Sequence, residues 1–108
     1  MPQQTVHNTP DVILSALEQH KDALRALGVR TLGLFGSARR GDTHAGSDLD
    51  FLVTLERPTF RSYMAVKEQL QAIFGLPVDL VIADAIKPRI RERVLAEVVY
   101  VAGLSPLS

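Results

Sequence analysis

Apolar residues recur every three or four positions between Pro10 and Gly28, the spacing that lines one face of an α-helix. The residues on this stripe are Ile13, Leu14, Leu17, Leu24 and Leu27. Glycine accepts the left-handed backbone conformation that ends many helices, so Gly28 suits the end of this one. The pattern predicts one helix from Pro10 to about Leu27. Residues 1–9 lack the pattern and are expected to form a disordered lead.

Shorter apolar runs, several of them with a period of two, predict β-strands further along the chain. The expected strands cover residues 29–35, 48–55 and 78–82, and a last extended segment covers residues 98–102. In the second strand, Leu49, Phe51 and Val53 alternate with residues 48, 50 and 52, of which the first two are aspartates. One face of that strand is therefore expected to be apolar, whereas the other carries Asp48 and Asp50.

Helical spacing returns after the second strand and again near the end of the chain. The expected helices cover residues 62–74 and 88–96, with a short helix at residues 37–40 and a loop at residues 43–47. Gly75 suits the end of the first of these helices, and Pro88 suits the first turn of the last one. Alternating helices and strands predict an α/β (α+β) fold, a small mixed sheet flanked by helices, in one domain over residues 10–103.

Composition narrows the class of protein. The 108 residues are 46% hydrophobic and 22% charged, which is typical of a single soluble domain. The formal net charge is zero, so stable nucleic-acid binding is not expected. There is no cysteine, which excludes thiolate catalysis and disulfides and suits a cytoplasmic protein. No apolar run approaches the roughly 20 residues of a membrane span.

The first candidate for chemistry is Gly36-Ser37, at the point where the first strand is expected to run into a short helix. Free backbone N–H groups and the positive end of a helix dipole bind anions at such a junction. Glycine lets a phosphate approach the backbone closely because it has no Cβ. The Ser37 hydroxyl can donate to a phosphate oxygen, so the pair predicts a phosphate site.

The second candidate is the pair Asp48-x-Asp50. Residues two apart on a strand face the same side, so both carboxylates are expected to point together. Two such anions repel each other unless a cation lies between them, and oxygen ligands without sulfur or histidine suit Mg²⁺ or Mn²⁺. Asp79, the one charged residue in an apolar strand, can join this face if its strand lies beside the second strand. The other reading of Asp79 is an ordinary strand-edge residue.

Together these residues resemble the minimal nucleotidyltransferases of the DNA polymerase β superfamily. The resemblance rests on Phe35-Gly36-Ser37, on Ser47-Asp48-Leu49-Asp50, on Asp79 and on the sequence from Lys87 to Val101. It implies that Gly36, Ser37 and Arg40 bind the triphosphate. It implies that Asp48, Asp50 and Asp79 form the metal and catalytic site, with Asp79 completing the metal site or acting as a base.

The resemblance further implies transfer of AMP from ATP, with Mg²⁺, to a hydroxyl of a protein. Many members of this group are antitoxins, and the implied acceptor is a tyrosine of a HEPN-type RNase toxin, which the modification silences. Two rivals stay open. One is a binding module that covers its partner without catalysis. The other is a nucleotidyltransferase that acts on a small molecule or an RNA end, although such relatives usually carry an additional substrate-binding domain.

Two clusters of basic residues also have more than one reading. Arg39 stands where a small residue is common in the family, so either Arg39 or Arg40 can face the nucleotide. The late basic segment, residues 87–93, is either a solvated helix face or a surface that meets an acidic partner or RNA.

Overall fold

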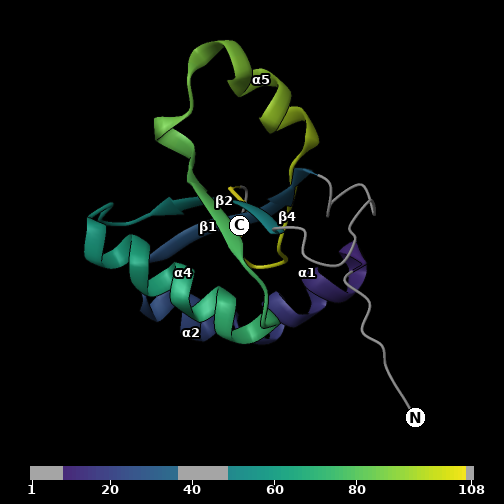
Figure 1. Cartoon of the computed structure of the whole chain (residues 1–108), viewed down its shortest axis with the longest axis vertical. Helices are drawn as coiled ribbons and strands as arrows, with labels where there is room; N and C mark the ends of the chain where they lie inside the picture. The colour runs from purple at the N-terminus through teal and green to yellow at the C-terminus, as the bar shows by residue number, and fades with distance from the viewer. Residues whose placement is uncertain (1–8, 37–48, 107–108) are drawn as a thin grey trace.

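The computed structural model describes residues 9–36 and 49–106. Within this part of the chain the strands form one sheet, with the order β3-β2-β1-β4 (Figure 1). The strands are β1 (Val29–Phe35), β2 (Leu49–Leu55), β3 (Val78–Ile82) and β4 (Val99–Tyr100). Strand β1 is antiparallel to both β2 and β4, whereas β2 and β3 are parallel. The predicted mixed sheet is therefore confirmed.

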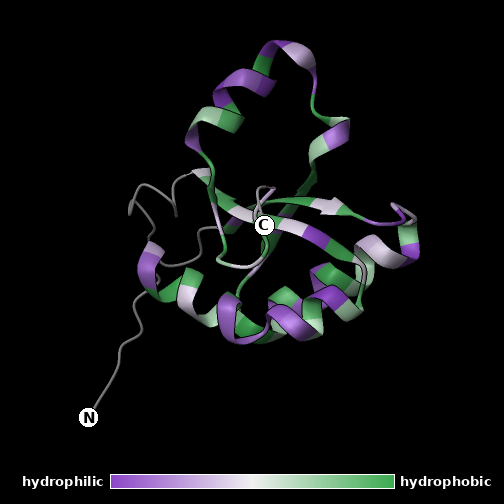
Figure 2. Ribbon diagram, turned by 180° about the vertical axis from the view of Figure 1, so that it is seen from behind, coloured by the Kyte–Doolittle hydropathy of each residue, from purple (hydrophilic) through white to green (hydrophobic). Residues whose placement is uncertain are grey.

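The helices lie on the two sides of this sheet. They are α1 (Pro10–Gln19), α2 (Lys21–Ala26), α4 (Phe60–Phe74) and α5 (Pro88–Glu97), with a short 3-10 helix, η1 (Ala83–Ala85), between the last two. Figures 1 and 2, seen from opposite sides, both show α1, α2 and α4 on one side of the sheet and α5 on the other. No helix in the described ranges has both the length and the hydropathy that crossing a membrane requires.

The expected first helix is wrong in one respect, because it is divided in two at His20. In a continuous helix the His20 N–H would donate to the Ala16 carbonyl oxygen, but here it donates to Leu17, at 3.0 Å. The His20 ring takes its place, with Nδ1 2.9 Å from the Ala16 oxygen. The side chain thus competes with the backbone and ends α1. Both halves still bury their stripe, as Leu17 and Leu24 show.

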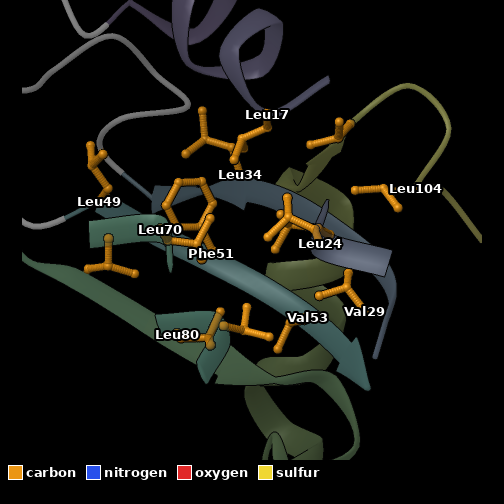
Figure 3. Packing of buried hydrophobic residues seen from close by; sticks show 14 of the residues in the cluster. Leu17, Leu24, Val29, Leu34, Leu49, Phe51, Val53, Leu70, Leu80 and Leu104 are labelled. Carbon is orange, nitrogen blue, oxygen red and sulfur yellow. The ribbon is translucent and has the colours of Figure 1, made fainter. Parts of the chain in front are cut away.

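The hydrophobic core lies between the sheet and the layer formed by α1, α2 and α4 (Figure 3). Its strand residues include Leu32, Leu34, Leu49, Phe51, Val53 and Leu80, and its helix residues include Ile13, Leu17, Leu24, Val66 and Leu70. Phe51, on a central strand, is fully buried and stacks on Phe74 with the ring centroids 5.9 Å apart. The predicted apolar face of β2 is therefore confirmed, and its aspartate-bearing face lies on the side away from this core.

The second long helix begins earlier than predicted. It starts at Phe60 because Thr59 caps it, its Oγ1 accepting the Ser62 N–H at 3.1 Å. It ends at Gly75, whose φ of 65° is the left-handed conformation predicted there. The last strand is shorter than predicted, covering Val99–Tyr100 alone. Residues 87–93 are exposed throughout, which fits both a solvated helix face and a surface that meets a partner.

Candidate active site

Two aspartates lie side by side on the face of the sheet that is opposite the core. Asp50 of β2 and Asp79 of β3 are directly paired in the register of these parallel strands. Paired residues of neighbouring strands share a face, and the strands are about 4.8 Å apart. Leu49 and Phe51, the chain neighbours of Asp50, are buried in the core, so Asp50 points to the other face. The structure thus meets the condition that the sequence set for Asp79.

The pair has the chemistry of a divalent-cation site. Asp50 is half-buried and Asp79 is exposed, so water and a ligand can reach both carboxylates from the same side. Adjacent carboxylates are stabilised by a cation between them, and hard oxygen donors suit Mg²⁺ or Mn²⁺. Among the described residues no group of three or more histidine, cysteine, aspartate or glutamate side chains could hold a metal ion. The third predicted ligand, Asp48, lies outside these residues.

Gly36 follows the last residue of β1 and lies against the same aspartate. Phe35 pairs with Asp50 in the sheet, so the end of β1 is next to the Asp50 side chain. Gly36 has a φ of 77°, and a Cβ placed on it would overlap Asp50 Oδ2 and lie 3.0 Å from Asp50 Cγ. The sequence predicted a glycine here so that a phosphate can approach the backbone. The structure adds another reason, because the Asp50 carboxylate fills the space that a side chain would use.

A further carboxylate reaches this point from the end of α5. The Gly36 backbone N–H donates to Glu97 Oε1 at 2.9 Å, and both groups are partly buried. Sequence reasoning did not single out Glu97. It is one of several charged residues in a helix without a strong apolar stripe, and 61 positions separate it from Gly36. No signal in a single sequence connects two such positions.

The remaining predicted residues of the site are not placed by the structure. Ser37, Arg39, Arg40 and Asp48 lie outside the described residues, as do the short helix and the loop expected between β1 and β2. Their roles stay predictions. The described part of the site consists of Gly36 at the end of β1, Asp50 and Asp79 on neighbouring strands, and Glu97 at the end of α5.

Comparison with known proteins shows which family has this sequence and this fold. Residues 17–101 match the family model described as a nucleotidyltransferase domain. The protein adenylyltransferase MntA of Thermococcus cleftensis is 44% identical over 95 residues, which cover 86% of this chain and 96% of that protein. The match therefore extends over nearly the full length of both chains.

Solved structures agree with the sequence match. A structure proposed to be that of a minimal nucleotidyltransferase superimposes with a TM-score of 0.65 at 34% identity, covering 80% of this chain and 93% of the other. A complex described as the tri-AMPylated HEPN toxin of Shewanella oneidensis with an MNT antitoxin has a chain that superimposes with a TM-score of 0.59. The two chains are 17% identical, and the superposition covers 82% of this chain and 71% of the other. This similarity therefore supports the fold alone. The chain belongs to the nucleotidyltransferase domain family, and it is a minimal nucleotidyltransferase of the DNA polymerase β superfamily.

Proposed function

We propose that this nucleotidyltransferase transfers AMP from ATP to a hydroxyl group of a protein partner, with Mg²⁺ as its cofactor. The observation that carries the proposal is the direct pairing of Asp50 with Asp79 beside the Gly36 turn. Pure binding of a partner needs no such convergence of carboxylates. The name of the Thermococcus cleftensis relative, a protein adenylyltransferase, supports a protein as the acceptor.

The roles of Asp50 and Asp79 are proposed from their places in the sheet, and those of Asp48, Ser37 and Arg40 from the family resemblance. Asp50 and Asp79, with Asp48, would hold the metal ion, which when bound neutralises charge on the triphosphate and on the group being transferred. Ser37 and Arg40 would bind the phosphates just after the Gly36 turn. Leu49 and Phe51, the neighbours of Asp50 in the sequence, are buried in the core. They therefore fix the position of the half-buried Asp50 on the strand.

The reaction is a substitution at the α-phosphorus of ATP. The acceptor oxygen forms a bond to this phosphorus, the bond from the phosphorus to the bridging oxygen of the β-phosphate breaks, and pyrophosphate leaves. The acceptor hydroxyl loses its proton to a base or to water. Asp79 is the exposed carboxylate of the pair, so it either completes the metal site or accepts this proton.

We further propose that the acceptor is a tyrosine of a HEPN-type RNase toxin and that the protein acts as its antitoxin. The complex of a tri-AMPylated HEPN toxin with an MNT antitoxin supports this assignment by its fold. We also propose a cytoplasmic location, where ATP is available as substrate; the lack of cysteine is compatible with it.

The proposal is tested by incubating the purified chain with α-labelled ATP, Mg²⁺ and the protein that co-purifies with it from its native host. We expect label on the co-purified protein, no label when Mg²⁺ is chelated, and no label from γ-labelled ATP. Label that appears on a small molecule or on RNA would show that the acceptor class is wrong. Neutralisation of the partner without label would favour steric binding.

Replacing Gly36 by alanine tests the contact between the turn and the aspartate. We expect Gly36→Ala to lower kcat/KM for AMP transfer by about a hundredfold, because misplacing a catalytic group by about 1 Å can cost that much. The matched control is Gly75→Ala, where φ is 65° but nothing lies within 4 Å of the added Cβ. Both variants pay backbone strain of about 1–2 kcal/mol. Equal activity of the two would contradict the role given to the contact with Asp50.

A further inference from the structure

Glu97 joins two parts of the molecule that are far apart in the sequence. It is the last residue of α5, and its Oε1 accepts the Gly36 N–H at 2.9 Å. Every other residue of α5 is exposed except Val94, which is half-buried. The half-buried Glu97 is thus the charged residue of this helix that turns toward the sheet.

Strand pairing fixes how Glu97 reaches Gly36. Two residues after Glu97 the chain enters β4, where Val99 pairs with Leu34 of β1. The side chains of Val98 and Tyr100 pack against Gly33, so closely that a Cβ there would lie 2.5 Å from Val98 Cγ2. The end of α5 is therefore held against the last residues of β1, and Glu97 lies beside the point where β1 ends.

Gly36 is consequently held from two directions. The Asp50 carboxylate lies over its Cα, and the Glu97 carboxylate accepts from its N–H. Because this N–H already has an anionic acceptor, it is not available to a phosphate while Glu97 holds it. Glu97 and Asp50 together thus fix the position of Gly36 at the end of β1.

We propose that Glu97 is a positioning residue of the active site: it holds Gly36 against Asp50, beside the proposed metal-binding pair. This inference rests on the proposed function, because it assigns Glu97 a role in nucleotide binding. In this role Glu97 acts through Gly36 and not through contact with the metal ion or the nucleotide. The contrary role is that of an internal competitor, a carboxylate that a triphosphate must displace from the Gly36 N–H.

The test uses three variants of the full chain. Glu97→Ala removes the acceptor, whereas Glu97→Gln keeps an acceptor oxygen but removes the charge. The control is Glu92→Ala, which alters an exposed glutamate of the same helix. Binding of a non-hydrolysable ATP analogue with Mg²⁺ is measured by calorimetry. Hydrogen exchange of the Gly36 amide is measured by NMR without nucleotide.

We expect Glu97→Ala to raise Kd for the analogue roughly tenfold, because binding must then order the Gly36 turn that Glu97 holds in the unaltered chain. Glu97→Gln should restore most of the affinity, and Glu92→Ala should match the unaltered chain. The Gly36 amide should exchange faster in Glu97→Ala alone. All three variants should stay folded at the assay temperature, as circular dichroism checks, which separates positioning from a general loss of structure.

The failures are distinguishable. If the unaltered chain does not bind the analogue with Mg²⁺, the proposed function fails and the role of Glu97 in nucleotide binding fails with it. If the unaltered chain binds and Glu97→Ala binds equally well, the positioning role alone is wrong. Tighter binding by Glu97→Ala would instead identify Glu97 as an internal competitor.

Discussion

Asp50→Asn is expected to lower kcat for AMP transfer by about three orders of magnitude while the chain stays folded. A metal ion contributes several kcal/mol to stabilising the charge that develops in a transition state, and each 1.4 kcal/mol is a factor of ten in rate. Asparagine keeps the size of the side chain but removes its charge. Asp50 is half-buried and lies on the face away from the core, so the substitution creates no cavity.

The control for this variant is Asp84→Asn. Asp84 is an exposed carboxylate in η1, beyond the far end of the strand that carries Asp79. Its kcat should stay within about twofold of the unaltered chain, since surface substitutions away from a site change little. Steady-state transfer of α-labelled AMP measures both variants, and circular dichroism checks the fold. If Asp50→Asn keeps full transfer activity, the aspartate pair is not the metal site.

The same pair of variants separates catalysis from steric binding. An antitoxin that silences its partner by modifying it loses that effect in Asp50→Asn. A module that works by covering its partner keeps it. Measuring the RNase activity of the partner in the presence of each variant and ATP therefore decides between the two readings that the sequence left open.

Phe51→Ala is expected to lower the free energy of unfolding by about 3–5 kcal/mol. Phe51 is fully buried on a central strand and stacks on Phe74, so alanine leaves a cavity in the middle of the core. A small domain has only about 5–15 kcal/mol of stability, so this variant should be near the limit of folding. Urea unfolding followed by circular dichroism measures the change.

The matched control for Phe51→Ala is Phe60→Ala. Phe60 is 79% exposed at the start of α4, so the same chemical change should alter the free energy of unfolding by about 0.5 kcal/mol or less. The contrast tests the burial pattern and not the residue type. Equal destabilisation by the two substitutions would contradict the assignment of the core face of β2, and with it the face assigned to Asp50.

The approximate positions of the strands and the core face of β2 were predictable because strand periodicity is a local property of the chain. Leu49, Phe51 and Val53 alternate with Asp50 in the sequence and are buried in the structure, so the sequence alone indicates which face carries the aspartate. The glycine after helix α4 was predictable for a similar reason: Gly75 adopts the left-handed conformation that glycine allows at lowest cost.

The features that the sequence did not predict depend on contacts between distant segments, or on a side chain that competes with a backbone hydrogen bond. The sequence could state only a condition for Asp79, because whether β3 lies beside β2 is a matter of sheet order. The contact of Glu97 with Gly36 arises from the pairing of β4 with β1, which no local pattern encodes. The break at His20 follows from a side-chain contact with Ala16 that helix periodicity does not reveal.

The central claim is that Asp50 and Asp79 bind a divalent cation together with a nucleoside triphosphate. The most direct test is a crystal structure of the chain grown with Mn²⁺ and a non-hydrolysable ATP analogue, with anomalous diffraction used to locate manganese. The account predicts an anomalous peak in contact with the carboxylates of both aspartates and with the phosphates of the analogue. A structure with the analogue bound and no manganese in contact with Asp50 and Asp79 would contradict it.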